Sequence, residues 1–507
     1  MRPATALAPY EQRERERHRQ ESNSAQRSFR GQELRRTAMF RKTQHIHLVG
    51  IGGSGMSGIA EVLLTLGYKV SGSDLSPSET TRRLEELGGR IAIGHHESNI
   101  GEAQVVVISS AVAATNPEVV AAKARQIPVI PRAEMLAELM RLKFGVAIAG
   151  AHGKTTTTSM VANVLAQGGL DPTMVIGGKV NALGSHARLG RGDLLIAEAD
   201  ESDGSFLRLA PTIAAVTNLD REHLDHYGSM ERLNDSFLEF VNKVPFYGLA
   251  VLCSDDERLR SLLPRVVKRY QTYGLNEHPD HAPDFRATDI SLRQWGSEFR
   301  VFFRGRNLGP FRLAIPGIHN VSNSLVAIAI GMELDIPVDL IRKGLAAFSG
   351  VERRFHLRGE KAGIMVVDDY GHHPTEIGAT LEATRQAWPE RRIVLVFEPH
   401  RYTRTRDLLD DFAQVLSTAD ALVVAEVYPA GEAPIPGADG KALCRAIRTR
   451  GLVEPVLLKS LDELPQVLAG IVRDGDVVLT MGAGSIGAAA HDLPAALSSA
   501  ASPGGAA

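Results

Sequence analysis

Cysteine is scarce in this sequence, and long apolar runs are absent. Only Cys253 and Cys444 occur among the 507 residues, far apart along the chain. This excludes a disulfide framework or a cysteine metal knuckle, and it fits a reducing cytosol. No stretch reaches the ~18 uncharged apolar residues that a membrane-spanning helix needs, and the N-terminus lacks the apolar core of a signal peptide. We therefore expect a cytoplasmic protein without membrane insertion.

A strong charge of either sign is also missing. The formal net charge is -2, with 44% hydrophobic and 23% charged residues, and such values are typical of folded, water-soluble proteins. This balance gives no indication of nucleic acid as a main partner. The length suggests roughly three domains of about 150 residues each.

The two ends of the chain differ in composition from the rest. Residues 1–43 are rich in Arg and Glu, with almost no aliphatic residues between Glu11 and Arg36, so they cannot bury enough apolar surface to fold alone. We predict a disordered extension there; the alternative is that Met39 is the true start. Residues 496–507 are mostly Ala, Ser, Gly and Pro, and we predict a flexible tail.

Between these ends, short apolar runs alternate with helical stretches three times. The alternation predicts α/β domains, each built on a mostly parallel sheet. The predicted domains are 44–142, which is Rossmann-like; 143–347, which is P-loop-like; and 348–495, which is again Rossmann-like. Residues 276–315 instead alternate charged and β-forming residues, and this indicates antiparallel strands beside the central parallel sheet.

A glycine-rich turn follows the first predicted strand. The turn and the start of the next helix comprise Gly50, Gly52, Gly53, Gly55, Met56 and Ser57. Glycines in the G-x-G-x-x-G pattern let the backbone approach a pyrophosphate at a helix N-terminus. Asp74 follows the second strand, where a ribose contact is expected. The residues alone leave three interpretations open: a dinucleotide site, a site for another pyrophosphate ligand, or a turn that only packs helix on strand.

A second glycine-rich turn follows the strand at 145–149. It comprises Gly150, Ala151, His152, Gly153, Lys154, Thr155 and Thr156. Ile148 stands where a phosphate loop has its first glycine, but the functional end is intact, since Lys154 can reach the β- and γ-phosphates and Thr155 can hold Mg²⁺. This turn predicts an ATP site. A third turn, Gly482–Gly487, is a weaker signal that is equally consistent with a simple βα connection.

Acidic residues and histidines follow the next strands of the central domain. Glu198 ends a buried strand at the head of an acidic run, and His223 and His226 follow the strand after it. The carboxyl ends of parallel strands meet at one edge of the sheet, where ligands bind. Because carboxylate oxygens suit Mg²⁺ and imidazole can join them, we predict Glu198 as a magnesium ligand and one of the two histidines at a second metal.

The third predicted domain places polar clusters after two of its strands, at 368–374 and 398–406. The second cluster holds three arginines, a residue type suited to bidentate capture of carboxylate or phosphate. Arg353 and Arg354 add two more near the domain boundary. Together the motifs favour phosphoryl transfer from ATP to an acceptor whose nucleotide part is held separately.

These motifs resemble the Mur ligase family, and in particular its alanine-adding branch. The matching stretches follow the family's order: Gly50–Leu63, Gly150–Thr158, Glu198–Leu207, Thr217–Tyr227, Pro316–Asn323, Gly350–Phe355, Asp368–Ile377, Pro399–Thr405 and Gly482–Gly487. The resemblance implies a domain for a UDP-linked sugar, a central ATPase and a mobile C-terminal domain. It also assigns the first glycine turn to the pyrophosphate of the UDP-sugar rather than to a dinucleotide.

The resemblance implies roles for individual residues. The implied ATP contacts are Gly150, Ala151, His152, Gly153, Lys154, Thr155, Thr156, Asn320, Asn323, Arg354 and Asp369. The implied metal ligands are Thr155, Glu198 and His223. The implied UDP-sugar contacts are the first glycine turn, Asp74 and His400. The amino acid is expected at Tyr370, His372, Arg401 and Arg404. The implied catalytic groups are Lys154, Glu198, His223, His372, Arg401 and Arg404.

The implied reaction uses ATP, with Mg²⁺ as two ions, to join L-alanine to the lactyl carboxylate of UDP-N-acetylmuramate through an acyl phosphate. Its products are UDP-N-acetylmuramoyl-L-alanine, ADP and phosphate, for peptidoglycan synthesis, cell-wall biogenesis, cell shape and cell division. A monomer and a homodimer both remain open. Ala151, Gly371 and Glu398 depart from the family's usual Thr, Ala and Gln. The modified lysine of several sister ligases has no evident counterpart after His223.

Three alternatives remain at this stage. A sister ligase that attaches a whole peptide to the same sugar shares the phosphate loop, but the run Gly55–Glu61 favours the alanine-adding branch. An NAD-dependent dehydrogenase using Gly50–Gly55 leaves Gly150–Thr158 unexplained. A non-catalytic nucleotide-binding regulator would not need Lys154 and Glu198 intact.

Overall fold

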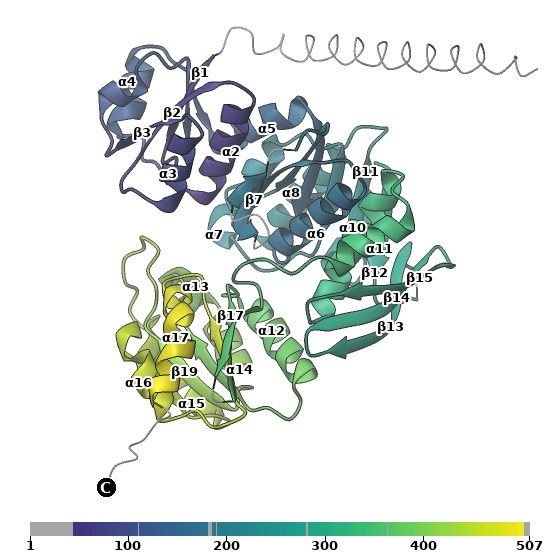
Figure 1. Cartoon of the computed structure of the whole chain (residues 1–507), viewed down its shortest axis with the longest axis vertical. Helices are drawn as coiled ribbons and strands as arrows, with labels where there is room; N and C mark the ends of the chain where they lie inside the picture. Colours follow the sequence, from purple (N-terminus) through teal and green to yellow (C-terminus); the bar gives the residue numbers. More distant parts are fainter. Residues whose placement is uncertain are drawn as a thin grey trace, which may run out of the picture. The chain divides into compact units, whose positions relative to one another are not determined.

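The computed structural model describes residues 44–500 except 110, 181–184, 189, 280–281 and 362. The extension predicted at 1–43 and the last part of the predicted tail, 501–507, lie outside the described residues. The chain forms two compact units, which divide between Glu138 and Leu139, just before the predicted boundary at residue 142. Figure 1 follows the elements along the chain.

The first unit is built on a five-stranded parallel sheet of order β3-β2-β1-β4-β5. Its elements are β1 His45–Val49, α2 Ser54–Thr65, β2 Lys69–Asp74, α3 Glu79–Glu86, β3 Arg90–Ile93, β4 Val105–Ile108, α4 Pro117–Ala124, β5 Val129–Pro131 and the boundary helix α5 Arg132–Arg141. Every residue of β1 is buried, as expected for a central parallel strand covered on both faces. The strand order reverses at β1, so the turn that follows β1 lies at a topological switch point, where ligands bind in such sheets.

The second unit contains two sheets, of which the larger has the order β15-β14-β13-β12-β11-β10-β6-β9-β7-β8. Its strands are β6 Phe144–Ala149, β7 Thr173–Val180, β8 Ser185–Arg188, β9 Leu194–Glu198, β10 Ile213–Val216, β11 Leu249–Cys253, β12 Tyr270–Gly274, β13 Phe285–Arg293, β14 Gly296–Phe303 and β15 Arg306–Leu313. Its helices are α6 Lys154–Gln167, α7 Leu224–Tyr227, α8 Met230–Asn242, α9 Glu257–Leu262, α10 Ile318–Glu333 and α11 Val338–Ala346. Helix α6 packs against β6 and β9 and against α10 and α11, so its N-terminus is rigidly placed.

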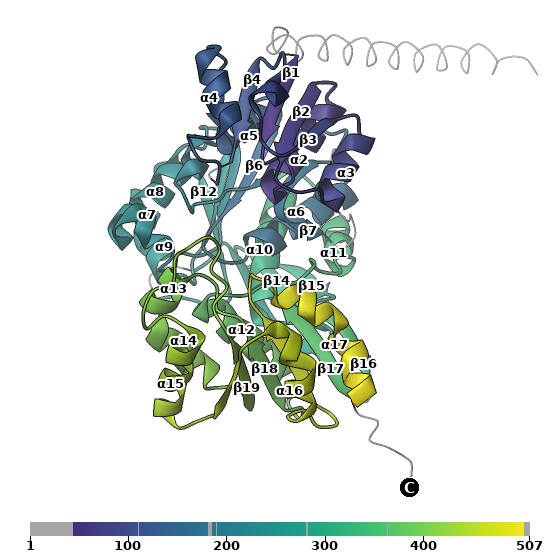
Figure 2. The same ribbon diagram turned by 90° about the vertical axis from the view of Figure 1, so that its left-hand side faces the viewer.

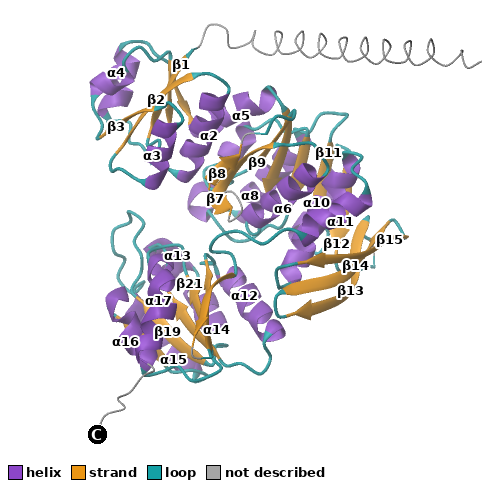
Figure 3. Cartoon of the chain, viewed as in Figure 1, coloured by secondary structure: helices purple, strands orange, loops and turns teal. Residues whose placement is uncertain are grey.

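The antiparallel strands predicted within 276–315 are present as β13, β14 and β15 (Figure 3). They do not form a separate layer beside the parallel sheet. Instead β13 pairs with β12 and continues the same sheet, which covers an edge of β12 that would otherwise leave backbone groups unpaired.

The smaller sheet of the second unit has the order β16-β17-β21-β18-β19-β20, parallel except for β16. Its elements are β16 His356–Lys361, β17 Ile364–Asp369, α12 Pro374–Ala387, β18 Ile393–Phe397, α13 Tyr402–Asp407, α14 Leu409–Leu416, β19 Ala421–Ala425, α15 Gly440–Arg450, β20 Pro455–Leu458, α16 Leu464–Ala469, β21 Val477–Met481 and α17 Ile486–Ala500. One apolar cluster packs α12, α14 and α15 on one face, and a second packs α16 and α17 on the other (Figure 2).

The three sheets confirm the predicted fold class of α/β domains with mostly parallel sheets. The predicted flexible tail begins inside α17, which continues to Ala500, because its alanine-rich sequence is a strong helix former. Among the described residues, no helix combines the length and the apolar character needed to cross a membrane.

Candidate active site

The phosphate loop connects the buried strand β6 to α6. Gly150 has φ +127° and Gly153 has φ +83°, conformations that L side chains rarely adopt. A Cβ at Gly153 would lie 2.9 Å from the Asn323 amide oxygen, and a Cβ at Gly150 would overlap the Thr217 hydroxyl. The N-cap residue Gly153 provides no side-chain cap, so the first amide groups of α6 point to a site suited to phosphate.

The lysine of this loop is held by a buried acid. The Lys154 ammonium donates hydrogen bonds to the Gly150 carbonyl (2.7 Å) and to both Glu201 carboxylate oxygens (2.8 and 2.9 Å). Burial opposes the charge on Lys154, but the Glu201 carboxylate raises its pKa above the usual value. Glu201 is only 1% exposed, and its carbonyl accepts a hydrogen bond from the Tyr227 hydroxyl (2.5 Å). The lysine is therefore a fixed cation at the loop.

A cavity of about 620 Å³ opens at the loop within the second unit. From the larger sheet it is lined by Ala151, Gly153, Lys154, Thr155, Glu198, Asp200, Ser202, Glu222 and His223, and from the smaller sheet side by Arg354, Tyr370, His372, Glu376 and Arg404, among others. It thus brings together most of the predicted metal, catalytic and amino-acid-binding residues.

A group of possible metal ligands lies at this cavity. Glu201, Glu222 and His223 each offer a ligand atom within 4.8 Å of the others. Burial lowers the pKa of His223, which favours the neutral imidazole that binds cations. His223 has φ +57°, a strained backbone of the kind that recurs at functional sites. Glu198, the first predicted ligand, lines the same cavity but lies outside this tight group.

The carboxylates at this cavity and the Thr155 hydroxyl fit a magnesium ion, since Mg²⁺ prefers such hard oxygen ligands. Sequence reasoning did not single out Glu201 or Glu222. Their position in the sequence could have indicated them, because Glu201 belongs to the same acidic run as Glu198, and Glu222 directly precedes His223.

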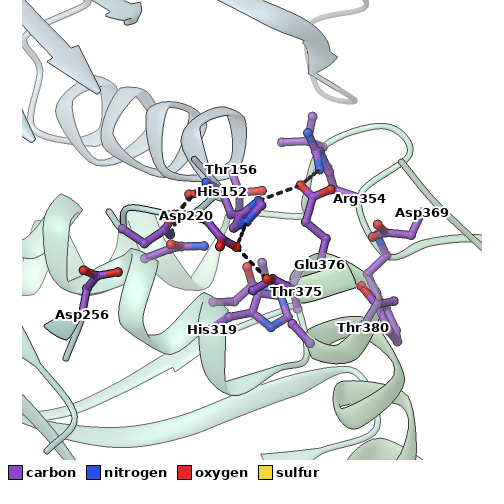
Figure 4. A pocket seen from close by; sticks show the side chains of 18 of the residues that line it. His152, Thr156, Asp220, Asp256, His319, Arg354, Asp369, Thr375, Glu376 and Thr380 are labelled. Atoms are coloured by element: carbon purple, nitrogen blue, oxygen red, sulfur yellow. Dashed lines mark hydrogen bonds and ion pairs between the residues drawn. The ribbon is translucent and has the colours of Figure 1, made fainter. Parts of the chain in front are cut away.

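A second cavity, of about 460 Å³, also borders the loop (Figure 4). The predicted nucleotide contacts Asn320, Asn323, Arg354 and Asp369 all line it, together with His152, Gly153 and Thr156. Its wall also carries His319, whose burial lowers its pKa to about 4, and the carboxylates Asp220 and Asp256. A partly apolar cavity beside a phosphate loop suits the nucleoside part of a nucleotide.

The ring of His152 lines this second cavity. Its Nε2 lies 2.8 Å from Asp220 Oδ2, and its Nδ1 lies 3.5 Å from Glu376 Oε1. Burial opposes protonation of the ring, but the two carboxylates raise its pKa to about 10. The two carboxylates therefore favour the charged, imidazolium form of His152.

The aromatic rings of the predicted amino-acid region form a row. His372 meets Tyr370 and His400 edge-on, with both centroid distances 5.5 Å, and His400 stacks on Tyr428 at 5.4 Å. Burial lowers the pKa of His372 and of His400 to about 4, so both are neutral near neutral pH.

The two predicted arginines of this region flank the row of rings. Arg401 is the N-cap of α13 with φ +72°. Arg404 lies 3.7 Å from Glu222, across the gap between the two sheets. A pocket lined by both arginines and by Glu222 and His223 lies between them.

The carboxylate of Asp74 lies at the first glycine turn. Asp74 Oδ2 accepts the Gly52 amide hydrogen (2.8 Å), and its Oδ1 accepts that of Leu75 (2.8 Å). The Asp74 carboxylate thus links the glycine turn to the end of β2. The Arg132 side chain fills the space over Gly55, where a Cβ would overlap it. Met56 and Ser57 are buried, at 2% and 4% exposure.

The third glycine turn holds an internal carboxylate. Glu398 accepts hydrogen bonds from the Ser485 hydroxyl (2.8 Å) and the Ile486 amide (2.9 Å), and Arg353 donates to the Gly482 carbonyl (2.6 Å). The N-terminus of α17 is thus already capped by Glu398. This turn closes a βα connection, in line with the simpler of the two interpretations.

Comparison with known proteins gives a consistent result over most of the described chain. Residues 45–144 match the model described as Mur ligase family, catalytic domain; residues 148–331 match the Mur ligase middle domain; and residues 353–484 match the Mur ligase, glutamate ligase domain.

Relatives of known name extend the match. The chain is 57% identical to UDP-N-acetylmuramate--L-alanine ligase of Geobacter sp. (strain M21), over 88% of this chain and 96% of that protein. It is 56% identical to the enzyme of the same name from Azoarcus sp. (strain BH72), over 89% and 97%.

Solved structures agree. The UDP-N-acetylmuramate-alanine ligase MurC from Thermotoga maritima is similar with a TM-score of 0.75 and 30% identity, covering 89% of this chain and 98% of that one. A murein peptide ligase from Psychrobacter arcticus is similar at a TM-score of 0.65 and 26% identity, covering 90% and 99%. This chain belongs to the Mur ligase family.

Proposed function

We propose that this chain is an ATP-dependent UDP-N-acetylmuramate–L-alanine ligase, which forms UDP-N-acetylmuramoyl-L-alanine for peptidoglycan synthesis. The observation that carries the proposal is the cavity at Lys154 and Thr155, which combines a phosphate loop, a group of acids and cationic side chains from the smaller sheet. The relatives at 56–57% identity bear the name of this activity over nearly their whole length.

ATP binds with its nucleoside in the cavity lined by Asn320, Asn323 and Asp369, and with its β- and γ-phosphates on the amides of the loop. Lys154 leaves Glu201 for the γ-phosphate and spreads its charge as the phosphoryl group moves. The lactyl carboxylate of UDP-N-acetylmuramate attacks the γ-phosphorus, ADP leaves, and the product is an acyl phosphate. The α-amine of L-alanine then attacks the acyl carbon, and phosphate leaves after a tetrahedral state.

Mg²⁺ would be held by Thr155, Glu198 and His223, with Glu201 and Glu222 close enough to join. When bound, the ions neutralise phosphate charge and orient the γ-phosphoryl group. The chain's own part is to supply hard oxygen ligands and a neutral imidazole at the edge of the sheet.

The smaller sheet supplies the groups that receive the amino acid. Tyr370, His372, Arg401 and Arg404 hold L-alanine and the lactyl carboxylate, because Arg matches carboxylate geometry. Burial lowers the pKa of His372, so the ring is neutral and offers a nitrogen that can accept a hydrogen bond from the attacking amine.

The first unit binds the UDP part through Gly50, Gly52, Gly53 and Gly55 at the N-terminus of α2. Arg132 adds a positive charge beside Gly55 and is suited to the pyrophosphate. Residues 44–142, 143–347 and 348–495 are then the UDP-sugar, ATPase and amino-acid domains. The enzyme acts in the cytoplasm, where ATP and nucleotide-linked precursors are found, as a monomer or a homodimer.

A murein peptide ligase is the nearest alternative, because it shares fold and phosphate loop. The identity to such a ligase is 26%, against 57% to an L-alanine ligase. The discriminating experiment supplies the purified enzyme with ATP, Mg²⁺ and UDP-N-acetylmuramate, with either L-alanine or a tripeptide as acceptor. Product with L-alanine alone supports the proposal, and product with the tripeptide alone overturns it.

A further inference from the structure

The phosphate loop is joined directly to the first turn of α12. His152, in the loop, faces Asp220 with Nε2 (2.8 Å) and Glu376 with Nδ1 (3.5 Å), as Figure 4 shows. Asp220 follows β10 of the larger sheet, whereas Glu376 lies on α12 of the smaller sheet. A neutral imidazole has only one N–H, so only the imidazolium can satisfy both acids. The ring is therefore a charged bridge between the two sheets.

Asp220 contacts residues of both sheets. Asp220 Oδ2, which accepts from His152, also accepts a hydrogen bond from the Thr375 hydroxyl (2.6 Å). His373, the N-cap of α12, lies 3.5 Å from the same oxygen. One carboxylate oxygen thus holds the phosphate loop and the start of α12 together.

Glu376 contacts the N-terminal end of its own helix, α12. Glu376 accepts the amide hydrogens of His372 (3.0 Å) and His373 (3.2 Å), which caps the helix. It also lies 3.6 Å from Arg354. Because His372 and Arg354 line the cavities, a displacement of Glu376 moves groups that face the nucleotide and the acceptor.

The far end of α12 also touches the larger sheet. Trp388, the C-cap of α12, meets Trp295 in the turn between β13 and β14, with ring centroids 4.8 Å apart. These are the only two tryptophans of the chain. The tryptophan emission of the chain therefore comes only from this contact between the two sheets.

We propose that His152 is a positioning residue that couples the phosphate loop to α12. The His152 amide donates to the Asn218 side chain (2.8 Å). Because His152 is part of the phosphate loop, a rearrangement of the loop around phosphate moves its ring as well. Through Asp220 and Glu376 the ring brings His372 and Arg354 to the acceptor when nucleotide is in place. The inference rests on the proposed function for its kinetic test but not for its structural test.

The kinetic test separates binding from turnover. His152→Ala should lower kcat about 10- to 100-fold, because a small misplacement of reacting groups has that effect, while the KM for ATP changes less than about threefold. Thr375→Val removes the hydroxyl that reaches Asp220 and should lower kcat. Its matched control Thr375→Ser keeps the hydroxyl and should retain most of the wild-type kcat. The double variant His152→Ala/Thr375→Val should be no slower than His152→Ala alone.

Two kinetic results overturn the coupling. A higher KM for ATP with kcat retained would make His152 a nucleotide contact only. Effects that multiply in the double variant would show that His152 and Thr375 act independently. If His152→Ala does not fold, the Thr375 pair decides the same question.

The structural test needs no ligation activity. Titration with ADP and Mg²⁺ should change the tryptophan emission of the wild-type protein, and Trp295→Phe should abolish the change. In His152→Ala the emission change should be lost although calorimetry shows ADP bound. An equal change in both proteins, or no change in the wild type, overturns the coupling. Failure of the proposed function would appear separately, as a wild-type enzyme that responds to ADP but forms no product with L-alanine.

Discussion

Removal of the phosphate-loop lysine has two separable consequences. In Lys154→Ala no cation reaches the γ-phosphate, so ligation should be abolished, while UDP-N-acetylmuramate should still bind to the first unit. The same change leaves Glu201 buried, at 1% exposure, without the ammonium that lies 2.8 Å from it. Breaking a buried ion pair by removing one partner typically costs about 3–5 kcal/mol, so the free energy of unfolding should fall by roughly that amount.

A double variant distinguishes the two consequences. Lys154→Met/Glu201→Gln replaces the ion pair by neutral groups of similar size, and such replacements are close to neutral in stability. Urea unfolding should therefore give a stability near that of the wild type, whereas phosphate release should remain absent. Near-normal turnover in Lys154→Ala would refute the role of the lysine, and a double variant as unstable as Lys154→Ala would refute the account of the Glu201 pair.

Three further predictions concern other positions. Burial raises the pKa of Glu118, but hydrogen bonds from His47, Ser73 and Asn99 prevail and lower it to about 2. The resulting stabilisation is up to about 3 kcal/mol. It is present above the unfolded pKa of 4.5 and is lost as the pH falls through about 2. In urea unfolding, the stability difference between the wild type and Glu118→Gln should therefore be largest near neutral pH and shrink toward pH ~3. His223→Ala should raise the Mg²⁺ concentration needed for half-maximal activity about 10-fold or more, and an unchanged requirement would contradict its place among the ligands. Gly153→Ala should weaken ADP binding in calorimetry, because a Cβ there is strained at φ +83° and meets Asn323.

The central strands of the three sheets could be predicted because they are short and almost wholly apolar. β1, β11 and β21 are buried along their whole length, as parallel strands covered on both faces must be. The strands missed were β3, β7, β8, β12, β16 and β20. Of these, β3, β8, β16 and β20 lie at sheet edges, where mixed polarity is tolerated and the periodic signal is weak, whereas β7 and β12 lie inside the larger sheet.

The local parts of the site were predictable for a related reason. A glycine turn between a strand and a helix is encoded in adjacent residues, so Lys154 and Thr155 could be assigned from spacing alone. Contacts such as His152 with Glu376 join residues far apart in sequence, and no spacing rule reports them. The Asp74 carboxylate accepts the Gly52 amide hydrogen, a contact that the glycine motif alone did not report; its expected contact with a ribose stays a prediction.

The central claim is that the site activates one specific carboxylate with ATP for capture by one specific amine. Phosphate release by the purified enzyme tests it most directly, with ATP and Mg²⁺ present and UDP-N-acetylmuramate and L-alanine added singly and together. We predict sustained release only when both are present, in step with UDP-N-acetylmuramoyl-L-alanine. Release that does not depend on L-alanine, or that occurs equally without UDP-N-acetylmuramate, would contradict the account.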